Sequence, residues 1–65
     1  MQYDKSIFFH LELSEAQAQA LAQFIKRVTF SGVRECAMDD AEAYDALAGL
    51  NAVRAALAEG GFDPR

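Results

Sequence analysis

The sequence has no tryptophan, one cysteine and one proline among its 65 residues. A single cysteine cannot form an internal disulfide and is typical of proteins from a reducing compartment. No apolar run approaches the roughly 20 residues needed to span a bilayer, and the first residues, MQYD, lack the basic start and apolar core of a signal peptide. We therefore expect a soluble, cytoplasmic protein that consists of one small domain, residues 1–65.

The residue patterns of an active site are also missing. His10 and Cys36 are the only residues of their kinds, and a nucleophile pair would need an orienting third group and an oxyanion site, neither of which the sequence indicates. We expect Cys36 to be a small buried hydrophobic residue and His10 to be half exposed. The carboxylates lack the turn glycine of a calcium-binding loop. We expect no enzymatic activity, no metal and no cofactor.

Negative charge is concentrated in one short window. The chain has ten acidic and six basic side chains, a net charge of −4, and residues 35–45 hold five carboxylates but no Lys or Arg. The members of this acidic cluster are Glu35, Asp39, Asp40, Glu42 and Asp45. Two interpretations stay open. The carboxylates can stabilise the start of a helix, or they can imitate nucleic-acid phosphates, because residues three or four apart on a helix lie about 5–6 Å apart at Cβ.

The cations form a smaller group. Lys26 and Arg27 come at the end of a predicted helix, where positive charge interacts favourably with the helix dipole. Arg34 precedes the acidic cluster and can pair with it. Three such residues in a chain of net negative charge are a weak indication of nucleic-acid binding. We therefore expect a protein partner, with no direct contact to nucleic acid or membrane.

The longest predicted helix spans residues 39–60, of which eight are Ala and three are Leu, both good helix formers. Asp39 and Glu42 have the spacing of a capping box, and Gly60 and Gly61 stand where a helix end is expected. The expected apolar face consists of Ala43, Ala46, Leu47, Leu50, Val53 and Leu57.

A second helix is predicted to begin at Ser14, which has capping-box spacing to Gln17. Apolar residues then repeat at helical intervals. They are Ala18, Leu21, Ala22, Ile25 and Val28.

An N-terminal strand is predicted at Lys5–Leu13, where apolar and polar residues alternate. Ile7, Phe9, Leu11 and Leu13 would share its buried side. Because a single strand leaves backbone groups unpaired, we expect it to pair with an internal strand near residues 28–34, such as Val28–Phe30, with a second copy of itself or with a target protein.

The connector after residue 28 has an alternative structure, a short helix at Val33–Ala37 capped by Ser31. The expected fold is α+β, with one N-terminal strand, in a short sheet, packed on two main helices that a short helical or turn connector joins. The protein would be a monomer or a homodimer.

The stretch FFHLELSEAQAQALAQFIKRV resembles the strand and first helix of ribbon-helix-helix repressors. The resemblance implies a dimer that binds DNA or an antitoxin-type partner through paired strands. The side that would contact DNA carries Ser6, Phe8, His10 and Glu12, however, with no Lys or Arg.

A second resemblance covers nearly the whole chain. HLELSEAQAQALAQFIKRVTFSGVRE, DDAEAY and the closing VRAALAEGGFDPR are similar to a short family without assigned chemistry that is carried by phages and mobile elements. Small size and acidity also look like the anti-CRISPR proteins, several of which imitate DNA. The resemblance implies a non-enzymatic inhibitor whose acidic cluster blocks the nucleic-acid-binding groove of a CRISPR effector subunit in the host cell. The ribbon-helix-helix regulator is the alternative.

Overall fold

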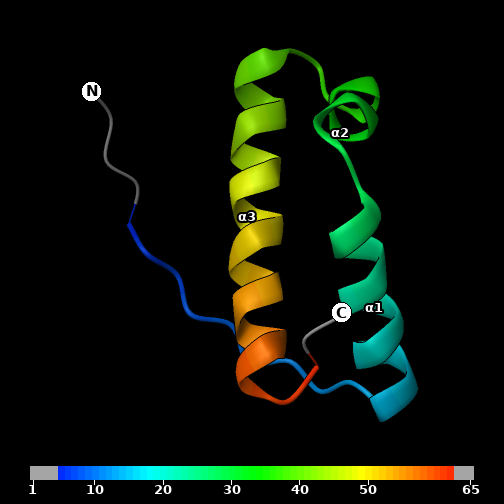
Figure 1. Cartoon of the computed structure of the whole chain (residues 1–65). Helices are drawn as coiled ribbons and strands as arrows, with labels where there is room; N and C mark the ends of the chain where they lie inside the picture. Colours follow the sequence, from blue (N-terminus) through cyan, green and yellow to red (C-terminus); the bar gives the residue numbers. More distant parts are fainter. Residues whose placement is uncertain (1–4, 63–65) are drawn as a thin grey trace.

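The computed structural model describes residues 5–62, which form three helices joined by short links. They are α1 (Glu15–Arg27), α2 (Phe30–Cys36) and α3 (Asp40–Glu59). α1 and α2 both pack against α3, and α2 lies beside the start of α3 while α1 lies beside its second half (Figure 1). None of these three helices is long and apolar enough to cross a membrane.

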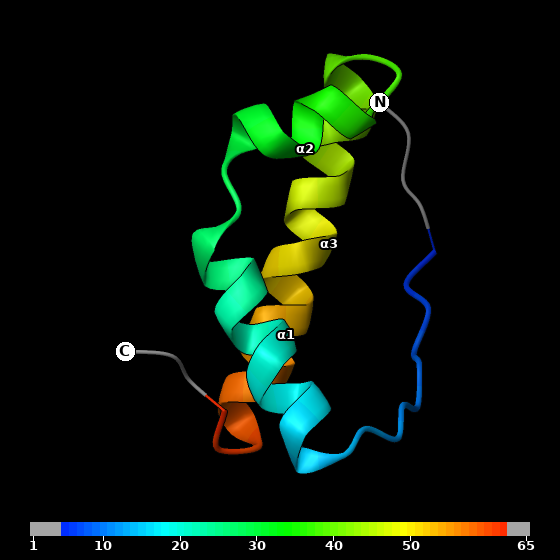
Figure 2. The same cartoon turned by 90° about the vertical axis from the view of Figure 1, so that its right-hand side faces the viewer.

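The predicted α+β fold is wrong for the part of the chain that the structure describes. Residues 5–14 form no strand, and neither does any other segment between residues 5 and 62. The predicted strand Lys5–Leu13 is an extended segment that runs beside α3 on the side away from α1 (Figures 1 and 2). A strand requires a partner, and the residues expected on its buried side, Ile7, Phe9, Leu11 and Leu13, are all exposed. Its proposed internal partner, Val28–Phe30, consists of the link between α1 and α2 and the first residue of α2.

α1 begins as the sequence predicts. The Ser14 hydroxyl accepts a hydrogen bond from the backbone N–H of Gln17 at 3.0 Å, and the Gln17 side chain accepts one from the backbone N–H of Ser14 at 2.9 Å. This reciprocal pair satisfies two donors that a helix start leaves free. The apolar stripe also faces the core, with Ala18, Ala22 and Ile25 buried.

The connector contains the helical alternative, α2, but it begins earlier than predicted. Thr29 caps it, since its hydroxyl accepts a hydrogen bond from the N–H of Gly32 at 3.2 Å. The predicted cap, Ser31, lies inside the helix. Phe30, the first residue of α2, stacks on Tyr44 of α3 with ring centroids 4.8 Å apart, and this contact helps to fix the short helix on the long one.

α3 ends in a glycine-dependent turn. The backbone N–H of Phe62 donates to the carbonyl of Leu57 at 2.8 Å, and that of Gly61 donates to Ala58 at 3.0 Å. Gly61 has a φ of 97°, a conformation that favours glycine. These two bonds define a Schellman motif, which returns Phe62 to the core.

The core is small and lies mainly between α1 and α3. Ala18, Ala22 and Ile25 of α1 pack with Leu57 of α3. Around them lie the partly buried residues Leu21, Leu50, Val53 and Phe62. The predicted apolar face of α3 is largely confirmed, except that Ala46 is exposed. Ala43, in the part of α3 beside α2, is fully buried.

Candidate protein-binding surfaces

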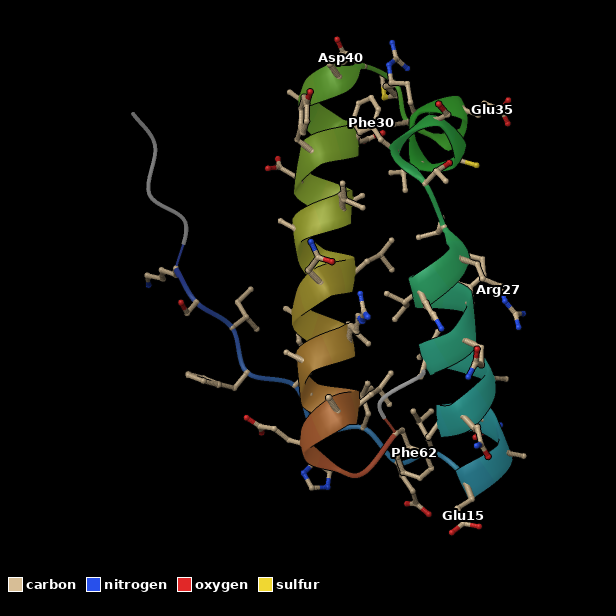
Figure 3. All side chains as sticks on the ribbon, viewed as in Figure 1. Glu15, Arg27, Phe30, Glu35, Asp40 and Phe62 are labelled. Carbon is tan, nitrogen blue, oxygen red and sulfur yellow. The ribbon has the colours of Figure 1, made fainter. Side chains whose placement is uncertain are left out.

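The acidic cluster lies at one end of the molecule. Glu35 belongs to α2, and the other four members lie at the cap and in the first two turns of α3. Figure 3 shows Glu35 and Asp40 at the same end of the molecule, opposite the end that carries Glu15. All five side chains are exposed. The chain therefore gathers the cluster in space as well as in sequence.

One member of the cluster forms an ion pair. The Arg34 Nε lies 2.6 Å from the Asp40 Oδ1, and the Arg34 Nη1 donates to the carbonyl oxygen of Ala37 at 3.1 Å. Arg34 thus connects the last turn of α2 to the first turn of α3, as its proposed pairing with the cluster predicts. Because Asp40 is 75% exposed, the pair contributes little to stability.

Two further members stabilise the start of α3. The Asp39 Oδ1 accepts a hydrogen bond from the N–H of Glu42 at 2.9 Å, as the capping prediction requires. The Glu42 Oε1 accepts one from the N–H of Met38 at 2.8 Å, one residue earlier than a reciprocal capping box would place it. Each carboxylate keeps a second oxygen outside these bonds.

Glu35 and Asp45 have neither an ion pair nor a side-chain hydrogen bond with the residues that the structure describes. Glu35 points outward from α2, away from α3 (Figure 3). Asp40 and Asp45 are five residues apart, which separates them by about 140° around the axis of α3. The five carboxylates therefore form a rounded acidic end and not a single row.

Charge elsewhere in the described residues is nearly balanced. Residues 34–45 carry five carboxylates and one guanidinium. The rest of the described chain carries the acids Glu12, Glu15 and Glu59 and the bases Lys5, Lys26, Arg27 and Arg54. One end of the molecule is thus strongly negative, and the remainder is slightly positive.

A family model for a family of unknown function, DUF7706, matches residues 1–65, the full length of the sequence. The chain belongs to this family. No curated protein and no solved structure matches it. The family description assigns no activity, so the phage origin and the anti-CRISPR character stay predictions.

A second surface is apolar, and the sequence indicated only half of it. Residues 5–13, here called the N-terminal arm, keep large apolar side chains exposed, with Phe8 94% and Phe9 81% exposed. A groove of about 580 Å³ separates the arm from the second half of α3. Ile7, Phe8, Phe9, Leu11 and Leu13 line one wall, and Ala52, Val53, Ala56 and Leu57 line the other. Val53 and Leu57 belong to the predicted apolar face of α3, whereas Ala52 and Ala56 were missed, although Ala-rich sequence on both sides of a helix is a sign that both sides are covered.

The structure gives no support for a nucleophile or a metal site among the described residues. Cys36 is exposed, so the expectation that it is buried is wrong. His10 lies in the N-terminal arm and is exposed. Between residues 5 and 62, no three His, Cys, Asp or Glu side chains come together in a way that could hold a metal ion.

Proposed function

We propose that the protein is a non-enzymatic inhibitor whose acidic end binds the basic nucleic-acid-binding groove of another protein. The observation that supports this proposal is the segregation of charge, with five exposed carboxylates and one guanidinium gathered over α2 and the start of α3. The negative electrostatic potential at one end of the small protein orients that end toward a positively charged groove as the two molecules approach.

The cluster keeps its charge available despite its structural roles. Glu35 and Asp45 have both carboxylate oxygens free of described partners, and Asp39 and Glu42 each use one oxygen to accept a backbone hydrogen bond. Arg and Lys side chains of a partner can pair with the remaining oxygens. Such contacts would occupy the positions that phosphates take when nucleic acid is bound.

The target class that we favour is a CRISPR effector subunit. These effectors hold their guide–target duplex in a positively charged channel and recognise it mainly through its backbone. A small acidic domain can therefore compete for the channel without reading any sequence.

The test uses purified effector complexes and labelled target DNA in a gel-shift assay. We expect the wild-type protein to prevent DNA binding by a susceptible effector. The variant with Glu35→Lys and Asp45→Lys should lose inhibition by roughly tenfold or more, since reversed charges at a charge-complementary surface oppose binding. Neither residue caps a helix or forms an ion pair with a described residue, so the fold should persist.

The matched control reverses two charges at the other end, with Glu15→Lys and Glu59→Lys. The first change opposes the dipole of α1 and the second favours that of α3, so their effects on stability should nearly cancel. This variant should inhibit like the wild type. Equal loss in both variants, or no inhibition of any effector by the wild type, would overturn the proposal.

A ribbon-helix-helix-like regulator is the second candidate. The observation that favours it is the extended apolar arm directly before a capped helix. Its weakness is the lack of cations for phosphate contacts on the arm beyond Lys5. A gel shift of duplex DNA by the protein alone, lost when salt is raised, would support the regulator and contradict the inhibitor.

A further inference from the structure

The N-terminal arm exposes apolar surface that a lone chain would be expected to cover. Phe8, Phe9 and Ile7 are 94%, 81% and 71% exposed. No backbone hydrogen bond links residues 5–13 to another segment of the described chain. An exposed run of this kind usually marks an interface.

α3 presents the facing half of the same surface. Two of the four residues that line its wall of the groove are small and exposed. They are Ala52 and Ala56. Such a surface allows a second element to approach closely, and the groove of about 580 Å³ leaves space for one between the arm and α3.

The exposed area of the whole chain is large for its mass. It is 5671 Å², whereas a folded monomer of 7.1 kDa is expected to expose about 4,100 Å². This excess is larger than the roughly 800 Å² that each partner buries in a standard protein–protein interface.

Charge selects the kind of partner. The arm and the second half of α3 carry two cations, Lys5 and Arg54, and two carboxylates, Glu12 and Glu59. This balanced surface can meet a copy of itself without net repulsion, while the acidic ends of two copies would repel each other.

We infer that the protein forms a homodimer in which each copy's arm and α3 groove are covered by the same surface of the second copy. The apolar side chains of one arm would fill the groove of the other copy. This inference concerns the end opposite the acidic cluster and does not rest on the proposed function.

The test measures molar mass by light scattering during size-exclusion chromatography over a range of concentrations. We expect the wild type to have twice the 7.1 kDa chain mass and to dissociate on dilution. Ala52→Glu places a charge in the groove at an exposed helical position, and it should raise the dissociation constant at least tenfold. Phe9→Ser with Leu11→Ser, in the arm, should act likewise without touching the helices.

The matched control is Ala41→Glu, the same change at an exposed position of α3 outside the groove. It should keep the doubled mass. Circular dichroism should show equal helix content in all variants. A wild-type mass of one chain at every concentration, a mass above two chains, or an Ala52→Glu variant that stays dimeric would each overturn the inference. A monomer that binds lipid vesicles would assign the surface to a membrane instead and would also overturn it.

Discussion

At the scale of single residues, Asp39 has a structural role that must be separated from its charge. Its carboxylate accepts the N–H of Glu42 at 2.9 Å and caps α3. Asp39→Ala should lower the free energy of unfolding by about 1 kcal/mol, the usual cost of a lost cap. Asp45→Ala, in the same helix but without a described hydrogen bond, should change it by less than about 0.5 kcal/mol. Urea denaturation measures both, and equal losses would show that Asp39 acts only through its charge.

Two glycines in and after α3 should respond in opposite directions to alanine. Gly61 has a φ of 97°, so Gly61→Ala should destabilise the protein by about 1 kcal/mol. A methyl group at Gly49 would meet no atom within 4 Å, so Gly49→Ala should stabilise α3 by about 1 kcal/mol through helix propensity. Thermal denaturation measures both changes. A stabilising Gly61→Ala would contradict the observed turn.

At the scale of elements, the docking of α1 on α3 depends on very few side chains. Ile25 is 5% exposed and packs in the cluster with Leu57. Ile25→Ala should cost about 2–5 kcal/mol, which is comparable to the whole stability expected of so small a domain. The expected result is a loss of the cooperative unfolding transition.

The neighbouring Phe24 provides the control for this prediction. It lies on the same helix but is 56% exposed, so Phe24→Ala should leave a cooperative transition in place. If both variants unfold alike, Ile25 and Phe24 are equally buried, and α1 does not turn the face with Ile25 toward α3 as the structure shows.

The sequence predicts an element well when nearby residues specify it and poorly when distant contacts do. α1 and α3 are specified locally, by caps such as Ser14 and Asp39 and by apolar stripes, and both were predicted. The start of α2 was misplaced because Thr29 and Ser31 are both acceptable caps, and the choice depends on Phe30 stacking on Tyr44, which is not local. The N-terminal arm failed as a strand because pairing requires a second segment, and alternation alone does not supply one.

The candidate site was predictable in part for the same reason. The five carboxylates are adjacent in sequence, so their gathering at one end followed from the predicted helix. The directions in which the five side chains point could not be predicted, because Glu35 lies on α2 and the orientation of α2 depends on packing. The groove beside α3 was not predictable, since it depends on where the arm runs relative to the helix.

At the scale of the whole molecule, the two ends have different surfaces and different proposed binding roles. One end is acidic and solvated, while the other is apolar and nearly neutral. If the apolar end joins two copies, each dimer presents two acidic ends, and binding to a partner with two basic grooves would gain from the linkage. Raising the salt concentration should weaken partner binding while leaving the apolar association intact or stronger. Sedimentation at low and high salt, with and without the partner, measures both effects.

The central claim is that the acidic end occupies the groove in which a partner holds nucleic acid. The most direct measurement is the fluorescence anisotropy of labelled target DNA added to an effector that is already saturated with this protein. If the acidic end does occupy the groove, the DNA should stay free until the protein dissociates. A ternary complex, in which the same effector holds the protein and the DNA together, would contradict it.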